Sequence, residues 1–232
     1  MPFYYGFDST YILVLIGVVL SLLASAKVKS TYAKYSQERS MSGMTGAQAA
    51  QRILNTAGIY DVTIQHVSGN LTDHYDPRNK TLNLSDTVYG SASVAAVGVA
   101  AHECGHAIQH DRGYAPLKMR SSLAPVANIG ANISWPLILV GLLLGGNGLL
   151  IQIGIAMFCL AVAFQLITLP VEFNASNRAM NLLEETSILY GDELKKTKKV
   201  LSAAALTYVA AAASSILQLL RLVLLYGRRR ND

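Results

Sequence analysis

Charged residues are scarce in this chain of 232 residues. Asp, Glu, Lys and Arg together make up 14% of it, against about 25% in an ordinary soluble domain. Hydrophobic residues make up 52%, and the mean hydropathy is +0.34. This composition excludes a disordered chain and argues against a soluble globular domain. The formal net charge is +5, but the basic residues lie between apolar runs instead of forming one basic face, so nucleic acid is not an expected partner.

The chain also lacks the signs of a secreted protein. It has two cysteines, Cys104 in a polar motif and Cys159 in an apolar segment, so no structural disulfide is expected. No basic residue precedes the first apolar run, at 11–26, and no small-residue cleavage site follows it. A signal peptide would show both features, and this run is therefore expected to remain as a membrane anchor.

Four apolar stretches could cross a bilayer as helices, which takes about 20 residues each. They cover residues 11–26 (lengthened by aromatic residues within 3–7), 125–144, 149–169 before Pro170, and about 203–226. A Gly-Gly-Asn-Gly turn at 145–148 should join the second and third into an antiparallel hairpin. The predicted fold class is predominantly α: an integral membrane protein of about four transmembrane helices with a small α+β region.

The pattern divides the chain into five segments. They are an N-terminal anchor helix at 1–26, a polar α+β region at 27–120, a transmembrane hairpin at 121–170, a polar helix at 171–200, and a C-terminal membrane helix with a basic tail at 201–232. Within 27–120, capping and periodicity predict helices at 45–57 and 91–110, short strands at 61–67 and 81–85, and a turn-rich stretch at 73–80.

The distribution of Lys and Arg predicts the topology. The block 27–120 contains ten of them and the block 172–199 contains five, whereas residues 1–10 and 145–148 contain none. Because cytoplasmic loops are enriched in Lys and Arg, both polar blocks are expected in the cytoplasm. The Arg residues at 228–230 do not fit a fourth full crossing, so a crossing against this rule, a re-entrant helix and a surface helix all stay open.

The strongest motif is His102-Glu103-Cys104-Gly105-His106, an H-E-x-x-H pattern on a predicted helix. Two histidines at i and i+4 lie on one helix face and can bind a single zinc ion, while the Glu between them faces the zinc-bound water. The sequence therefore predicts His102 and His106 as metal ligands and Glu103 as the catalytic acid and base. Cys104 falls on the other side of the helix and is expected to pack in the core.

A catalytic zinc needs a third protein ligand. His110 lies on the same helix stripe, but at about 1.5 Å per residue it is roughly 12 Å along the axis from His102, too far for one ion. His66 and His74 lie on or near the predicted strands and are expected at the surface or beside the substrate. Glu172 lies at the start of a predicted helix, where the hairpin returns to the cytoplasmic side. A carboxylate at that membrane boundary is costly to desolvate unless it is paired or bound to a metal. Glu172 is the predicted third ligand.

The motif at 102–106, the Trp135-Pro136 segment, the LPVEFNASNRA stretch from Leu169 and the TLNLS strand from Thr81 together resemble the bacterial membrane neutral zinc metallopeptidase family. The similarity covers almost the whole chain, and a more distant one extends to the Glu-zincins. The resemblance implies an integral-membrane zinc peptidase with His102, His106 and Glu172 as ligands and Glu103 as acid and base. The region at 27–120 would then be its small α+β, zincin-like cytoplasmic catalytic region, and the helix at 171–200 would carry the third zinc ligand. Many Glu-zincins have Asp four residues after the ligand Glu, where this chain has Ser176.

Several residues are candidates for supporting roles. Ser176, Asn174 or Asn177 could orient a zinc-bound histidine, and Arg178, His110 or Tyr75 could donate to the oxyanion that forms during peptide hydrolysis. A substrate could pair in extended form with the strand at 81–85, through the backbone of Leu82, Asn83 and Leu84. A core strand is an equal reading of the same residues.

The predicted function is that of a membrane-embedded zinc endopeptidase of the bacterial cell membrane, with its site in the cytoplasm and membrane-associated or misfolded proteins as substrates. The predicted cofactor is Zn²⁺. Expected partners are a protein or peptide substrate, the lipid bilayer, and a second copy of the chain or another membrane protein. A catalytically silent zinc-binding scaffold is the alternative, although a structural zinc site has no need of Glu103. A transporter accessory ranks last, since few charges lie within the apolar stretches.

Overall fold

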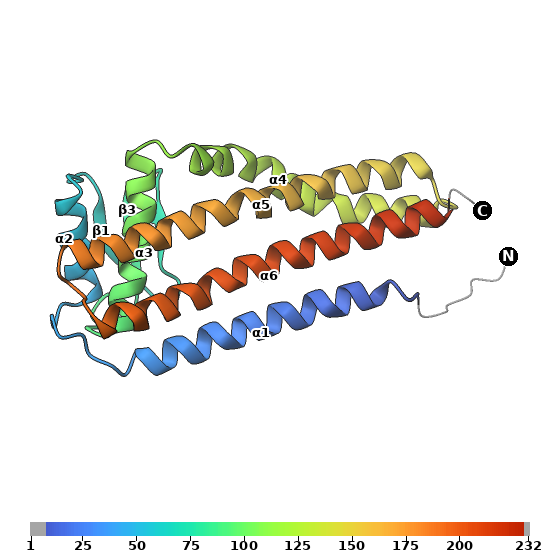
Figure 1. The fold of residues 1–232 in the computed structure, drawn as a ribbon. Coiled ribbons are helices and arrows are strands. Elements are labelled where there is room, and N and C mark those ends of the chain that lie inside the picture. Colours follow the sequence, from blue (N-terminus) through green and yellow to red (C-terminus); the bar gives the residue numbers. More distant parts are fainter. Residues whose placement is uncertain (1–7, 230–232) are drawn as a thin grey trace. The chain divides into compact units, whose positions relative to one another are not determined.

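The computed structural model describes residues 8–229, so the aromatic residues at 3–7 and the chain end at 230–232 lie outside the described residues. The structure is mostly helical, with one small sheet, as the sequence predicts (Figure 1). Its elements are α1 (Tyr11–Tyr35), α2 (Gly46–Thr56), β1 (Thr63–Val67), β2 (His74–Asp76), β3 (Thr81–Ser85), α3 (Val94–Asp111), α4 (Ala115–Leu143), α5 (Gly148–Glu185) and α6 (Asp192–Arg229).

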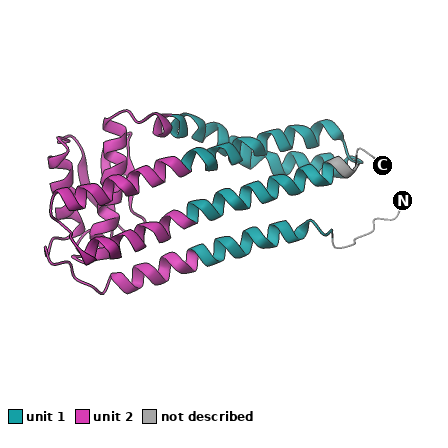
Figure 2. Ribbon diagram, in the orientation of Figure 1, with its two compact units in different colours: residues 1–24, 119–168, 207–232 teal, residues 25–118, 169–206 magenta. Residues whose placement is uncertain are grey.

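The chain divides into two compact units, coloured separately in Figure 2. Unit 1 comprises Met1–Ala24, Met119–Thr168 and Thr207–Asp232, and unit 2 comprises Ser25–Lys118 and Leu169–Leu206. Each of these divisions falls inside α1, α4, α5 or α6, so all four long helices contribute to both units. The division into five segments drawn from the sequence stays a prediction.

Four helices are long and apolar enough to span a membrane: α1, α4, α5 and α6, the last counted from Asp192 to Tyr226. They correspond to the four predicted stretches. The turn between α4 and α5 has Gly145 and Gly146 at positive φ. The Asn147 side chain accepts hydrogen bonds from the backbone N–H groups of Leu149 and Leu150 at the start of α5. The described part of α6 is one continuous helix, which argues against a re-entrant segment.

The prediction that Pro170 ends the third apolar helix is wrong, since α5 continues through Pro170 to Glu185. Pro125 and Pro136 likewise lie inside α4. A proline removes one backbone hydrogen bond and crowds the preceding turn, but helices in apolar surroundings tolerate this when neighbours satisfy the freed groups. The consequence for function is direct: Glu172 lies within a continuous helix instead of at the start of a new one.

Unit 2 contains a three-stranded sheet in the order β1-β3-β2, with β3 parallel to β1 and antiparallel to β2. Strand β2 forms within the stretch that was predicted as turns, because His74–Asp76 pairs with Thr81–Asn83. The central strand β3 has partners on both sides. The prediction that Leu82, Asn83 and Leu84 form an edge for substrate is therefore wrong, and the core-strand reading is correct; these three residues are at most 7% exposed.

The core of unit 2 lies between α2, α3, β3 and the last turns of α5. Helix α2 begins with a capping box in which Thr45 and Gln48 bond each other's backbone N–H groups, the arrangement typical of a well-defined helix start. The largest aliphatic side chains of the core are fully buried; they include Ile53, Leu54, Leu82, Leu84, Leu183, Ile188 and Leu189. This core holds α3, the helix with the H-E-x-x-H motif, against its neighbours.

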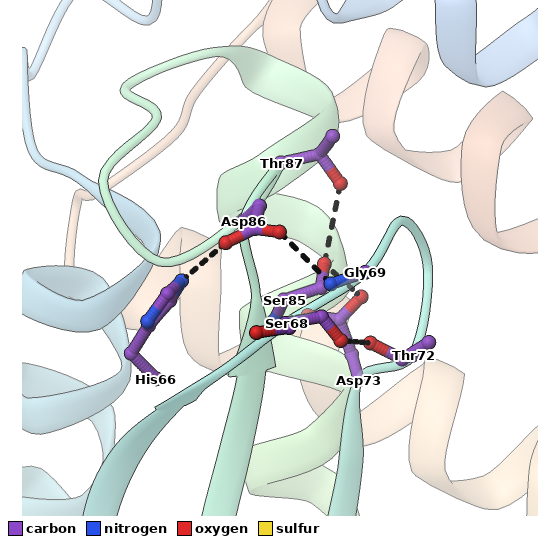
Figure 3. A network of polar contacts seen from close by, with 8 residues as sticks. All are labelled: His66, Ser68, Gly69, Thr72, Asp73, Ser85, Asp86 and Thr87. Carbon is purple, nitrogen blue, oxygen red and sulfur yellow. Dashed lines mark hydrogen bonds and ion pairs between the residues drawn. The ribbon is translucent and has the colours of Figure 1, made fainter.

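A polar network fixes the loop between β1 and β2 (Figure 3). The Asp86 carboxylate accepts the Gly69 N–H at 2.8 Å and lies 2.6 Å from His66 Nε2. Asp73 accepts the backbone N–H and the hydroxyl of Ser85 at 2.7 and 2.9 Å. Burial raises the pKa of Asp73, and the hydrogen bonds from Ser85 oppose that rise. The network ties the loop to the end of β3.

Candidate metal centre

Helix α3 brings the H-E-x-x-H motif into close contact with α5. The Ser93 side chain caps the start of α3 by accepting the Ala96 N–H. At Gly105 the two helices approach so closely that a Cβ atom would lie 2.6 Å from the Ala175 carbonyl oxygen. A side chain at position 105 would therefore push α5 away from the two histidines. Gly105 is the residue that permits the metal site to close.

His102, His106 and Glu172 converge, with ligand atoms that all lie within 4.8 Å of one another. Glu172 Oε2 is 3.3 Å from His102 Nε2 and 3.5 Å from His106 Nε2. The three side chains are largely buried, with exposures of 14% and 12% for the histidines and 3% for the glutamate. The structure thus brings together the three ligands that were predicted from two separate parts of the sequence.

The distances from Glu172 to the two histidines fit a shared zinc ion. Bonds of about 2.0–2.1 Å at tetrahedral angles separate two ligand atoms by about 3.4 Å, which matches the distances from Glu172 to both histidines. Two imidazoles and one carboxylate are also a ligand set found at catalytic zinc sites. The donor chemistry and the geometry both suit Zn²⁺.

Hydrogen bonds at the Nδ1 atoms orient both histidine rings. Ser176 Oγ lies 3.1 Å from His102 Nδ1, and Gln109 Oε1 lies 3.0 Å from His106 Nδ1. Because an amide oxygen can only accept, His106 must donate through Nδ1, which leaves the lone pair of Nε2 directed to the metal position. Ser176 occupies the position where many Glu-zincins have Asp, and its hydroxyl lies within hydrogen-bond distance of His102.

Gln109 is the residue that the sequence analysis missed. It is fully buried, and its amide nitrogen donates to the Val171 carbonyl at 2.8 Å and to Asn174 Oδ1 at 3.0 Å. These two bonds fix which way the amide faces, so its oxygen must face His106. The spacing offered one signal: position 109 is three residues after His106 and therefore lies on the same helix face.

Two of the candidate supporting residues belong to this same group of contacts. Asn174 Oδ1 accepts a second hydrogen bond, from Arg178 Nε at 2.8 Å. The Arg178 guanidinium also lies 6.0 Å from the centre of the Tyr114 ring. Arg178 thus reaches the histidine ligand indirectly, through Asn174 and Gln109. Among the described residues, the hydrogen bonds that reach the two histidines come from Ser176 and Gln109 and do not include Asn177.

The other oxyanion candidates contact each other. Tyr75 Oη lies 2.9 Å from His110 Nδ1, which joins β2 to the last turn of α3. His110 is outside the three-ligand cluster found among the described residues, in agreement with the distance argument from the sequence. Burial, reinforced by the charges of Asp61, Asp76 and Asp111, raises the pKa of Tyr75 to about 12. The phenol therefore stays protonated at neutral pH and can donate.

The remaining motif residues have distinct environments. Cys104 is fully buried and its thiol points to the Ala50 carbonyl of α2, so it packs in the core as predicted. Burial raises the pKa of its thiol well above the usual value. Burial lowers the pKa of His106, but the hydrogen bond to Glu172 and the charges of Glu103 and Glu172 outweigh it and raise that pKa overall. Glu103 itself is 8% exposed, beside His102 on α3.

The comparisons with known proteins agree with this geometry. The family model described as "Putative neutral zinc metallopeptidase" matches residues 10–227, and the chain belongs to that family. A relative from Bacillus subtilis (strain 168), named "Putative membrane protease YugP", is 48% identical over 213 residues, which cover 92% of this chain and 94% of the relative. No solved structure matches the chain. The family and the relative assign this protein to the membrane-associated zinc metallopeptidases.

Proposed function

We propose that this protein is a membrane-embedded endopeptidase that requires zinc and hydrolyses membrane-associated or misfolded proteins. The observation that supports it most is the convergence of His102, His106 and Glu172 within 4.8 Å, with Glu172 at the distance from each histidine that a shared tetrahedral zinc ion requires. These three side chains would hold the ion. Zinc bound there would supply a Lewis acid that polarises the scissile carbonyl and lowers the pKa of a bound water to about 7.

Glu103 is the proposed general base and acid. It adjoins His102 on α3, in the position that the H-E-x-x-H motif gives to the proton-transfer carboxylate. It would take a proton from the attacking water as the new C–O bond forms, and would then deliver that proton to the amine nitrogen as the C–N bond breaks. Glu172 faces the histidines and is nearly inaccessible, so it serves as a ligand and not as the base.

The oxyanion donor comes from one of two groups. Tyr75 and His110 form a pair at 2.9 Å, and both side chains can act as donors. The contacts of Arg178 run through Asn174 and Gln109 to the Nδ1 atom of His106, which is turned away from the metal position. We therefore favour the pair over Arg178. A Tyr75→Phe variant should lower kcat with little change in KM, since a donor to the oxyanion acts only in the transition state.

The proposed location is the cell membrane, with unit 2 facing the cytoplasm. The support is the set of fifteen Lys and Arg residues in 27–120 and 172–199, against none in 1–10 and 145–148. Labelling of a single cysteine introduced by Ser68→Cys, in a Cys104→Ala/Cys159→Ala background, tests this. A thiol reagent that does not cross the membrane should label Ser68→Cys only after cells are broken.

The activity test compares the wild type with Glu103→Gln, both purified in detergent and loaded with zinc, on an unfolded protein substrate. We expect the variant to keep stoichiometric zinc and to lose cleavage by a factor of 10³ or more, because it keeps all three ligands and loses the proton carrier. Glu184→Gln, an exposed change on α5, is the matched control and should cleave as the wild type does.

Each outcome separates the candidate functions. Equal cleavage by wild type and Glu103→Gln would identify a contaminating protease and would refute the mechanism. Zinc bound by the wild type but lost in His102→Ala, together with no cleavage by any form in detergent or in proteoliposomes, would favour the zinc-binding scaffold instead.

A further inference from the structure

A cavity of about 930 Å³ in unit 2 lies between α1 and α6, separate from the metal ligands. Five lysines line it: Lys27, Lys34, Lys195, Lys198 and Lys199. Three hydroxyl groups, those of Ser30, Thr31 and Ser202, line it as well. The proposed peptidase chemistry uses none of these residues. Ammonium groups and hydroxyls together are the donors that hold a phosphate.

The lysines form two facing stripes. On α1 the lining residues Lys27, Thr31 and Lys34 recur every three or four positions, and on α6 Lys195, Lys199 and Ser202 do the same. Such spacing places each set on one side of its helix. The opposite side of α6 faces the core through Thr197, Val200 and Leu201, which are at most 4% exposed. The lysines therefore face the cavity while the rest of α6 is packed.

The protein offsets the positive charge in this cavity only in part, through the charge of Asp192, which acts on Lys195 and Lys199. Asp192 is the one carboxylate among the lining residues, and it already pairs with Lys196 at 3.1 Å. Lys196 is not a lining residue, and it bonds Glu38 at 2.6 Å as well. Within the described residues, no ion pair is found for any of the five lining lysines. Close cations repel, so an anionic occupant would stabilise this arrangement.

The sequence around the cavity indicates where the anion comes from. Lys27 directly follows the apolar run 11–26, and the lining residues Ala203 and Leu206 open the apolar part of α6. Lysines at the ends of two apolar helices reach the level of lipid headgroups. Leu206, 47% exposed, adds an apolar surface on the same stripe. A soluble phosphate ester would make no use of this apolar part.

We propose that the cavity between α1 and α6 binds the phosphate of an anionic phospholipid, with the lysines around the headgroup and Leu206 against the acyl chains. This site is separate from the proposed zinc site, and its test needs no peptidase activity. Each lysine near an anionic lipid surface strengthens binding roughly fivefold. Removal of two of them should therefore weaken binding roughly 25-fold.

The test uses the full-length protein in a neutral detergent and measures lipid adducts by native mass spectrometry. Phosphatidylglycerol and phosphatidylcholine are titrated separately, and glycerol 3-phosphate is added as the soluble competitor. We expect tight, saturable binding of phosphatidylglycerol to the wild type and a roughly 25-fold loss in Lys27→Gln/Lys199→Gln. The control Lys29→Gln/Lys118→Gln removes the same charge from two exposed lysines outside the cavity and should change binding less than twofold.

Three results would overturn the proposal. Equal binding of the two lipids would show that charge plays no part, and equal losses in the two double variants would show only a general surface effect. Displacement of the lipid by glycerol 3-phosphate at matched concentration would assign the site to a soluble phosphate. If the cavity variant fails to fold, the acetylation of lysines in the wild type is measured with and without phosphatidylglycerol. The lipid should reduce acetylation of Lys27 and Lys199 but not of Lys29, and an equal extent of acetylation at all three would refute the site.

Discussion

Units 1 and 2 differ in how much of their large aliphatic surface they expose. Unit 2 encloses large aliphatic residues such as Ile53 and Leu183 completely, as a soluble domain does. Unit 1 exposes many of its large residues, with Leu143 at 75% and Leu149 at 67%, while Ser134 on α4 is fully buried. An aliphatic surface of this kind is stable in lipid and unfavourable in water. The difference supports a bilayer environment for unit 1.

The helices of unit 1 are held by small residues at close range. A Cβ atom at Gly130 would lie 2.7 Å from the Met157 carbonyl oxygen, and one at Gly154 would lie 2.6 Å from an Ile138 side-chain carbon. Ser214 also approaches Gly17 and bonds its carbonyl oxygen at 2.9 Å. Lipid removes the hydrophobic drive between helices, so close packing and hydrogen bonds must hold them. In unit 2, the burial of aliphatic side chains holds the helices together.

The largest expected effect tests this contrast within one helix. Leu183→Ala in the unit 2 part of α5 should lower the free energy of unfolding by about 2–5 kcal/mol, because it leaves a cavity at a fully buried site. Leu149→Ala in the unit 1 part of α5 should change it by less than about 0.5 kcal/mol. Denaturant titration in mild detergent measures both, and equal losses would contradict the contrast.

A second, smaller effect addresses helix packing in unit 1. Gly154→Ala should cost about 1–3 kcal/mol, since the added methyl group meets Ile138 and the Ser134 carbonyl. Gly148→Ala is the matched control on the same helix, where the new atom would meet only the Tyr226 hydroxyl at 3.4 Å. Thermal unfolding in detergent should show a lower Tm for Gly154→Ala alone. A stable Gly154→Ala protein would mean that lipid-facing contacts hold α4 and α5 together.

Local signals in the sequence predicted much of this structure. Thr45 with Gln48 marked the start of α2, the Gly-Gly-Asn-Gly turn marked the α4–α5 hairpin, and His102 with His106 marked one face of α3. Each signal depends on residues within a few positions of one another. Glu172 was found differently, from the cost of a carboxylate at an apolar boundary, and the structure brings it to the histidines.

Features set by long-range contacts were not predictable in this way. The central position of β3 depends on its pairing with both β1 and β2, which alternation within a strand does not specify. Continuation of α5 through Pro170 depends on neighbours that compensate the lost hydrogen bond. The role of Gln109 depends on Val171 and Asn174, more than sixty residues later. In each case the deciding partner is distant in sequence.

The third prediction concerns the polar contacts that unit 2 adds to its core. Gln109→Leu removes the acceptor that fixes His106, and loss of such a support typically weakens metal affinity about 10–100-fold. Competition with a zinc chelator measures the affinity, and the Tm without metal monitors the fold separately. Gln65→Leu, an exposed change on β1, should leave the zinc affinity unaltered. An unchanged affinity in Gln109→Leu would show that Gln109 only fills space.

The smallest effect is expected at the exposed edge of unit 2, in the loop between β1 and β2. The hydrogen bond from Gly69, aided by His66, holds the pKa of Asp86 below its usual value. A carboxyl with a depressed folded pKa contributes stability above its unfolded pKa, and that contribution is lost as pH falls through the folded pKa. Hydrogen exchange of residues 66–73, corrected for intrinsic rates, should therefore speed up in acid for the wild type. Asp86→Asn should exchange fast already at neutral pH and lose this acid dependence, because the amide has no charge to titrate. An acid response that persists in Asp86→Asn would assign the loop's pH dependence to another carboxyl group whose pKa is lowered on folding. Asp73 does not meet that condition, because burial raises its pKa.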